Sequence, residues 1–285
     1  MPIVITVRKS YLESWEKMSD FFLLSGVLLL AFTAWKTHSL TPGGAAASAI
    51  IGTVITFAFS MNGLLLLAGF FISSTWLGRY YSGKSKLKEE FEDKGEKRDA
   101  SQVLANGGWA AAAALMFILT EQSYWIAAYI GSLAAANSDT WASSIGKSSR
   151  VKPVMVITRK PVLPGQSGGT SAKGTIGALA GSLFIVLLAY ILFGLAGPFA
   201  AMWLIWPFLL LTGFISQWLD AFTGAFFQVL FKCDQCGTLT EKLYHCQQRT
   251  RTVKGWKWVT NDTVNHICTF SGMILGGVSG AIFYV

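Results

Sequence analysis

The segment 131–150, GSLAAANSDTWASSIGKSSR, begins as an apolar run that fits a membrane and ends as a basic loop. A single acid, Asp139, stands where the two parts meet. A carboxylate at the point where a helix leaves a bilayer is costly unless a partner or a cation compensates its charge. The segment therefore predicts a membrane helix that ends near residue 138, followed by a functional acid at the membrane surface.

The composition of the whole chain supports a membrane protein. Hydrophobic residues make up 52% of the 285 residues and charged residues only 13%, whereas a soluble domain carries about 25% charged residues. A helix that crosses a bilayer needs about 20 apolar residues. We therefore expect an all-α, multi-pass membrane protein that forms one domain over residues 1–285. The expected eight transmembrane helices are 20–36, 43–60, 61–78, 102–120, 122–138, 174–195, 200–218 and 264–285.

The positions of the basic residues predict how these helices are oriented. The loops 79–101, 139–173 and 232–262 carry seven, six and six of the 23 Lys and Arg residues. Because Lys and Arg collect in cytosolic loops of membrane proteins, we expect these three loops in the cytosol. This distribution explains the net charge of +8 without a nucleic-acid partner. The N-terminal segment contains both acidic and basic residues, so its own orientation stays open.

Two further acids occupy positions comparable to that of Asp139. Asp220 lies in SQWLDAFTGAFF, and Asp262 precedes the last span in VTNDTVNH. The expected topology brings all three acids to the cytosolic face, where they would repel one another without a cation. Mg²⁺ binds one or two carboxylates and leaves its other positions to water and phosphate oxygens. We predict that the three aspartates hold Mg²⁺ and act in catalysis; the alternative for each is an ion pair or a helix cap.

The loop that follows Asp139 has the composition of an anion site. Its sequence, ITRKPVLPGQSGGTSAKGT over residues 157–175, combines glycines, hydroxyls and basic side chains. It runs directly into a helix, whose N-terminus favours phosphate. The spacing is not that of a P-loop. We expect Lys160 to act in catalysis, and the expected phosphate-binding residues are Arg159, Gly165, Ser167, Gly168, Gly169, Thr170, Ser171, Lys173 and Gly174.

Three smaller patterns complete the candidate residues. Arg98, Gln102 and Asn106 recur every four residues at the entry to a span, so this stripe must face protein or a polar cavity. The last span carries glycines at GxxxGxxxG spacing, which is typical of close helix packing. A zinc site or a set of reduced thiols can explain a cluster in the loop 232–262, although two adjacent ligands would be awkward. Its members are Cys233, Cys236, His245 and Cys246.

Five motifs together resemble those of a known family. They are SDTWASSIG, ITRKPVLPGQSGGTSAKG, DAFTGAFFQ, CDQCG and WVTNDTVN. The chain is similar over residues 20–285 to the transmembrane-protein-19-like integral membrane family, a domain-of-unknown-function family numbered 92. Its best understood branch is phytyl-phosphate kinase. By this resemblance Asp220 is the acid of the third motif, and Ser144 replaces a Glu of the family. Thr140, Ser143, Asn261 and Asn265 match family positions beside the other two aspartates.

The resemblance implies prenyl-phosphate chemistry. We expect a membrane kinase that converts an isoprenoid monophosphate to the diphosphate, with Mg²⁺ and a nucleoside triphosphate, CTP or ATP, as co-substrate. Phosphoryl transfer needs positioning and charge neutralisation, which fits acids, lysines and glycines without a well-placed histidine. The alternatives are a transferase that forms a CDP-linked lipid, a transporter or flippase of a phosphorylated metabolite, and a non-catalytic homologue.

Overall fold

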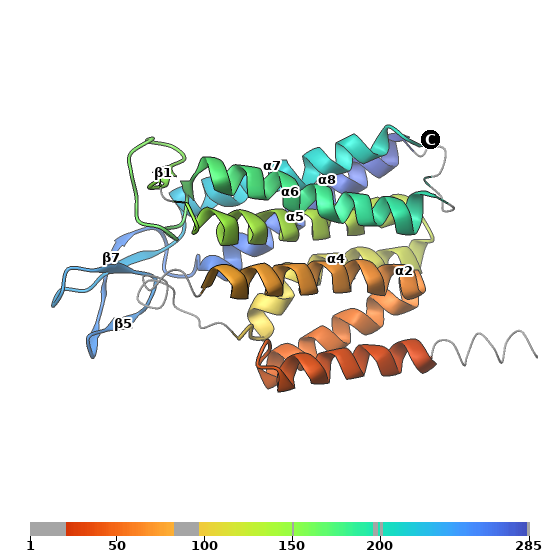
Figure 1. Cartoon of the computed structure of the whole chain (residues 1–285), viewed down its shortest axis with the longest axis horizontal. Helices are drawn as coiled ribbons and strands as arrows, with labels where there is room; N and C mark the ends of the chain where they lie inside the picture. The colour runs from red at the N-terminus through yellow and green to blue at the C-terminus, as the bar shows by residue number, and fades with distance from the viewer. Residues whose placement is uncertain (1–20, 83–96, 150, 196–198, 200–201, 284–285) are drawn as a thin grey trace, which may run out of the picture.

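Helices that run side by side along one axis make up most of the molecule (Figure 1). The structure is a computed structural model and describes residues 21–82, 97–149, 151–195, 199 and 202–283. The N-terminal segment and the charged centre of the expected loop 79–101 lie outside these residues. The described helices are Phe21–Lys36, α2 (Pro42–Ser82), α4 (Ala100–Thr120), α5 (Tyr124–Gly146), α6 (Ala172–Ala189) with the π-helical turn η1 (Tyr190–Gly194), α7 (Ile205–Phe226) and α8 (Asn261–Phe283).

A membrane protein built from helices is confirmed, but the count of eight spans is not. Within the described residues, five helices are long and apolar enough to cross a bilayer: α2, α4, α6 with η1, α7 and α8. Helix Phe21–Lys36 is apolar but shorter. Large apolar side chains such as Ile50, Ile176 and Ile282 are exposed on the outer surface. Lipid contact explains this exposure, because a soluble protein would bury most of these side chains.

Two of the expected spans, 43–60 and 61–78, belong to the single element α2. A straight helix of 41 residues would be about 60 Å long, roughly twice the thickness of the hydrocarbon core. The backbone at Ser60 is not helical, with φ 50° and ψ −141°. In Figure 1 the chain turns back within α2, so that its two halves run in opposite directions. The expected boundary therefore coincides with a reversal inside α2.

Helix α5 forms the centre of the bundle and is buried along most of its length. Glycines of α8 let the two backbones approach closely. A Cβ atom added at Gly272 would lie 2.5 Å from the carbonyl oxygen of Gly131, and one added at Gly276 would overlap the carbonyl of Ala127. This close packing confirms the interpretation of the GxxxGxxxG pattern. Because α5 is surrounded by other helices, its polar residues do not face lipid.

The three aspartates lie within helices, whereas all three were expected just outside the spans 122–138, 200–218 and 264–285. Helix α5 continues to Gly146, seven residues beyond Asp139, and α8 begins at Asn261. Asp220 lies inside α7, which ends at Phe226. The extension of α5 is stabilised by packing against α6, where Gly177 would place a Cβ atom 3.1 Å from Ile145. Hydropathy does not detect such an extension, because helix–helix contact stabilises it rather than the membrane.

Short strands make the expectation of an all-α fold incomplete. β1 (Val154–Met155) pairs with β2 (Gly169–Thr170). Residues 230–254 form what we call the β subdomain. It contains an antiparallel sheet in the order β4 (Leu239–Thr240), β3 (Leu230–Lys232) and β7 (Arg251–Lys254), and a hairpin of β5 (Tyr244–His245) and β6 (Gln248–Arg249). Strands of two to four residues are too short to produce a recognisable alternation of polar and apolar residues.

The strands collect at one end of the helical bundle. Figure 1 shows β1 and the β subdomain at the left end, whereas the connection from α4 to α5 lies at the right end. The segment after helix Phe21–Lys36 is also held close to the start of α4, where Arg98 N donates to Ser39 O over 3.0 Å. The expected basic loops 139–173 and 232–262 are thus at the same end, which agrees with the topology inferred from charge.

Candidate functional site

A polar cavity of about 1000 Å³ opens at the end of the bundle that carries the strands. It brings together residues from α2, α4, α5, α7, α8, the loop before α6 and the β subdomain. Most of the candidate residues from the sequence line it. They are Arg98, Gln102, Asn106, Asp139, Thr140, Ser143, Gly165, Ser167, Gly168, Gly169, Thr170, Ser171, Gly174, Asp220, Asn261, Asp262 and Asn265.

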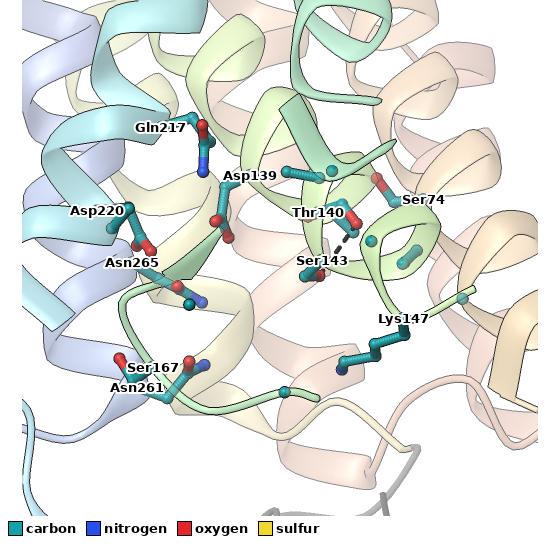
Figure 2. A pocket seen from close by; sticks show the side chains of 18 of the residues that line it. Ser74, Asp139, Thr140, Ser143, Lys147, Ser167, Gln217, Asp220, Asn261 and Asn265 are labelled. Carbon is teal, nitrogen blue, oxygen red and sulfur yellow. Dashed lines mark hydrogen bonds between the residues drawn. The ribbon is translucent and has the colours of Figure 1, made fainter. Parts of the chain in front are cut away.

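The carboxylates of Asp139 and Asp220 point into the same space, with the amide of Asn265 beside them (Figure 2). The two acids are close enough to interact directly. Asp220 Oδ1 is buried and has no hydrogen-bond partner among the described residues. Asp262 is buried, lines the same cavity and accepts a hydrogen bond of 2.6 Å from Ser101 Oγ. Helices distant in sequence therefore bring the three acids to one cavity.

This set of donors suits a hard divalent cation. Carboxylate and amide oxygens are typical ligands of Mg²⁺. A buried carboxylate oxygen that lacks a hydrogen bond costs free energy, and a bound cation would remove that cost. Asp220 has such an oxygen, and Asp139 lies next to it. We conclude that the residues present fit Mg²⁺ at this position.

The loop before α6 lines the cavity with its glycines and hydroxyls. Gly168 adopts φ +79°, and a Cβ atom there would lie 2.5 Å from Ala225 of α7. Only glycine allows this close approach without strain. Ser171 caps α6, because its Oγ accepts a hydrogen bond of 3.1 Å from Gly174 N. The loop is therefore held tightly between α6 and α7, with its small residues toward the cavity.

The basic side chains of the same loop do not line the cavity, and this corrects the expectation for them. Arg159, Lys160 and Lys173 are exposed and absent from its wall. Arg159 lies in a turn with φ 56°, where its N donates to Met155 O over 2.9 Å. Lys173 is in the exposed first turn of α6. The glycines of this loop face the cavity and its basic side chains face away from it. The amino-acid composition of the loop does not reveal this difference.

Other cations line the cavity instead. Lys147, directly after α5, extends toward it from the side opposite Asp220 (Figure 2). Arg79 of α2 and both Lys97 and Arg98 before α4 also line it. Burial lowers the pKa of Arg98 from 12.5 to about 10, so its guanidinium stays charged at neutral pH. A cavity with carboxylates on one side and cations on others can bind a metal together with a polyanion.

The predicted stripe on α4 faces the cavity rather than lipid. Gln102 also takes part in a capping box, since its side chain accepts from Asp99 N over 3.1 Å while Asp99 accepts from Gln102 N. The guanidinium of Arg98 lies 6.0 Å from the ring centroid of Phe70, near the apolar interior. These contacts hold the start of α4 in a fixed position beside the aspartates.

A buried asparagine that the sequence reasoning missed joins three helices behind the site. Asn137 Oδ1 accepts hydrogen bonds from Ser73 and Ser74 of α2, over 3.2 and 3.0 Å. Its Nδ2 donates to Gly181 O of α6 over 2.8 Å. Asn137 lies two residues before Asp139 on α5, so this network determines the position of that aspartate relative to α2 and α6. The sequence signal that could have identified Asn137 is its position within an apolar run, two residues before Asp139.

The β subdomain also reaches the cavity, through contacts that the sequence reasoning did not include. Ser167 of the glycine loop donates to Gln228 Oε1, and Gln228 Nε2 donates to Glu241 Oε1 over 2.8 Å. Gln228 and Glu241 both line the cavity. A fourth acid is therefore present near the three aspartates. It comes from a turn after β4, where no local sequence pattern marks a site.

An apolar pocket of about 260 Å³ adjoins the polar cavity. It lies between helix Phe21–Lys36, both halves of α2, and α4. Ser39, Arg98, Gln102 and Asn106 line both spaces, so the two lie next to each other. Its wall is otherwise apolar, with Val27, Leu64 and Phe71 among its residues. An amphipathic molecule could thus place a polar head near the aspartates and a chain between the helices.

The comparisons with known proteins identify the family. A family model described as integral membrane protein DUF92 matches residues 25–273. The chain belongs to the DUF92 family. It is 30% identical over 237 residues to protein PGR of Arabidopsis thaliana, a match that covers 75% of this chain and 81% of that protein. It is 27% identical over 268 residues to an uncharacterized membrane protein of Synechocystis, covering 91% and 92% of the two chains.

The chain is also similar to the chloroplastic protein VTE6 of Arabidopsis thaliana. The identity is 25% over 243 residues, which covers 83% of this chain and 64% of VTE6. No solved structure shows a significant match to the chain. The family is therefore established by sequence, and the arrangement of its motifs in space comes from the present structure.

Ser144, the position at which the resemblance implies a Glu, is buried and lines the cavity. The wall of the cavity contains a glutamate from another segment, because Glu241 enters it from the β subdomain. The three aspartates are therefore not the only carboxylates of the described cavity.

Four potential metal ligands meet in the β subdomain. The ligand atoms of Cys233, Cys236, His245 and Cys246 all lie within 4.8 Å of one another. The sequence alone is compatible with either a zinc site or a set of reduced thiols. Zinc was disfavoured because His245 and Cys246 are adjacent in the chain and would both have to bind one ion. The chain reverses at this pair, with Cys246 at φ 50° in the turn between β5 and β6, so both side chains reach the same point.

Proposed function

We propose that this protein is a membrane phosphotransferase that converts an isoprenoid monophosphate to the diphosphate at the expense of a nucleoside triphosphate. The observation that carries the proposal is that a polar space and an apolar space lie side by side. A polar cavity with acids and cations shares Arg98, Gln102 and Asn106 with an apolar pocket. A lipid phosphate needs this combination, since its head is anionic and its chain must avoid water.

The acids and cations have separate tasks in this reaction. Asp139, Asp220 and Asp262 would hold Mg²⁺, and the ion would supply positive charge against the charge that develops during transfer. Lys147 and Arg98 would bind phosphate oxygens, and the N–H groups of the loop 165–171 would add further donors. The volume of about 1000 Å³ is sufficient for a nucleotide together with a lipid head group.

The transfer step needs no strong base. An oxygen of the acceptor phosphate attacks the γ-phosphorus of the nucleoside triphosphate, and the bond to the β–γ bridging oxygen breaks. The products are the isoprenoid diphosphate and a nucleoside diphosphate. The acceptor has a second pKa of about 6 and is largely ionised at neutral pH. Binding and charge neutralisation by the residues above then supply most of the catalysis.

The resemblance to phytyl-phosphate kinase and membership in the DUF92 family support this choice of substrate class. The apolar pocket between helix Phe21–Lys36, α2 and α4 would hold the lipid chain. A transporter is less favoured, because the acids lie at one end of the bundle rather than midway along it. A transferase that forms a CDP-linked lipid would use the same residues, and the products of the reaction distinguish it.

The test is an assay of the purified full-length chain in lipid nanodiscs with Mg²⁺, CTP or ATP, and phytyl or geranylgeranyl monophosphate. We expect the lipid diphosphate and a nucleoside diphosphate, detected by mass spectrometry. Asp220→Asn keeps the size of the side chain but removes its charge, and should lower kcat by about a hundredfold or more. Asp234→Asn is the matched control, since Asp234 is exposed and pairs with Arg251 outside the cavity.

Two results would contradict the proposal. Release of pyrophosphate with a CDP-linked lipid would identify a nucleotidyltransferase instead. Absence of turnover with either lipid phosphate and either nucleotide, from protein that is folded and monodisperse, would reject the phosphotransferase.

A further inference from the structure

The β subdomain has too little hydrophobic core to explain its order. Its strands contain two to four residues, and most side chains from Asp234 to Gly237 and from Cys246 to Arg249 are exposed. Segments of this size usually depend on disulfides or a metal, because they bury too little apolar surface to offset the loss of chain entropy. All four cysteines of the chain are free thiols in the structure.

The geometry of the four side chains matches a tetrahedral metal site. His245 Nδ1 lies 3.4 Å from Cys236 Sγ and 3.2 Å from Cys246 Sγ. Zinc–sulfur bonds of about 2.3 Å and zinc–nitrogen bonds of about 2.0 Å imply sulfur–nitrogen separations of about 3.5 Å. Hydrogen bonding does not account for both contacts, because a neutral imidazole nitrogen has one lone pair for one donor.

The backbone around the ligands is shaped for this arrangement. Gly237 N donates to Cys233 O over 2.9 Å, and Cys233 N donates to Thr238 O over 2.9 Å, so the CDQCG segment forms a tight turn. Gly237 completes it with φ +74°. In the second turn Cys246 and Gln247 adopt φ 50° and 61°, a left-handed conformation that is unfavourable for residues other than glycine. A metal bond to Cys246 would offset that cost.

We propose that Cys233, Cys236, His245 and Cys246 bind a structural Zn²⁺ ion that holds the β subdomain together. Three thiolates and one imidazole are soft and borderline ligands, which favour zinc over Mg²⁺ or Ca²⁺. Four protein ligands leave no position for substrate, so the site is structural rather than catalytic.

The ion would also position a part of the polar cavity. The ligand pairs flank residues 239–243, and Glu241 in this segment contacts Gln228 at the cavity wall. Cys233 follows β3 directly, and β3 pairs with both β4 and β7. Removal of zinc would therefore release Glu241 from the cavity while leaving the membrane helices intact.

The test measures zinc itself and does not depend on the proposed phosphotransferase. The full-length chain is purified without a polyhistidine tag or chelator, and its metals are determined by plasma mass spectrometry. We expect about one zinc per chain. Cys236→Ser should abolish zinc binding. Cys268→Ser should retain the bound zinc, because Cys268 lies in α8 and donates to Ala135 O. Substoichiometric zinc in the unaltered chain, or stoichiometric iron in its place, would overturn the proposal.

A second measurement avoids the risk that the variant fails to fold. Treatment of the unaltered chain with a mercurial thiol reagent should release one equivalent of zinc to a colorimetric indicator. Hydrogen exchange after this release should rise in residues 239–250 and stay slow in α5 and α8. Equal exchange in the β subdomain before and after release would contradict a structural role for the ion.

Discussion

Lys147 and Lys160 differ in whether their side chains reach the polar cavity. Lys147 reaches the space in front of Asp139 and Asp220, whereas Lys160 is exposed on the outer side of the loop before α6. Both lysines are in the same basic segment of the sequence, so proximity to the motifs does not separate them. The direction of each side chain decides which one can contact a bound phosphate.

This difference gives a prediction at the residue scale. Lys147→Ala should raise the KM for the nucleotide or lipid phosphate about tenfold, since a hydrogen bond to a charged group contributes about 1.5–3 kcal/mol. Lys160→Ala is the matched control and should change KM less than twofold, because an exposed charge contributes little. Steady-state kinetics with both substrates varied provides the measurement. A larger effect at Lys160 would restore the role that the sequence motif had indicated for it.

At the scale of elements, α5 is the helix on which the site depends. It carries Asp139 toward the cavity, and it is held by Asn137 on the side of α2 and α6 and by glycines on the side of α8. Asn137 and Ser138, which would be costly in lipid, donate instead to the backbone oxygens of Gly181 and Ala178 in α6. A change in the packing of α5 should therefore affect stability and the position of Asp139 together.

The contact between α5 and α8 allows a matched pair of substitutions. A Cβ atom at Gly276 would overlap the carbonyl of Ala127, whereas one at Gly277 would meet Ala128 Cβ at 3.4 Å. Gly276→Ala should destabilise the protein by about 1–3 kcal/mol through overpacking. Gly277→Ala should leave stability unchanged or raise it, because alanine favours the helix by up to about 1 kcal/mol. Thermal unfolding in detergent compares the two, and equal midpoints would contradict this packing.

At the scale of the whole molecule, the basic loops and the polar cavity lie at the same end of the bundle. The β subdomain, the basic loop before α6 and the polar cavity are all there. Lys and Arg remain in the cytosol during membrane insertion. We therefore propose that the cavity opens to the cytosol, where nucleoside triphosphates are available.

Cysteine labelling tests this orientation. A membrane-impermeant maleimide should modify Lys160→Cys only in inside-out vesicles and Gln122→Cys only in right-side-out vesicles, because the two residues are exposed at opposite ends of the helices. Peptide mass spectrometry separates each new cysteine from the four native ones. Modification of Lys160→Cys from outside alone would reverse the proposed topology.

The sequence by itself determined the helical membrane fold, most helix positions, the close packing of the α8 glycines and the choice of the three aspartates. These properties depend on local quantities, namely the length of apolar runs, the spacing of glycines and the rarity of acids in them. The predicted number of eight spans was not confirmed, because two of them form the single element α2 and because α5 carries polar residues into the bundle.

Only the tertiary structure decided which side chains face the cavity. It selected Lys147 over Lys160, brought Glu241 in from the β subdomain, and placed an apolar pocket beside the polar cavity. It also brought the adjacent His245 and Cys246 to one point through a turn at positive φ. The physical reason is that side-chain direction depends on the phase of each helix and the path of each loop. Contacts between segments far apart in the sequence determine both.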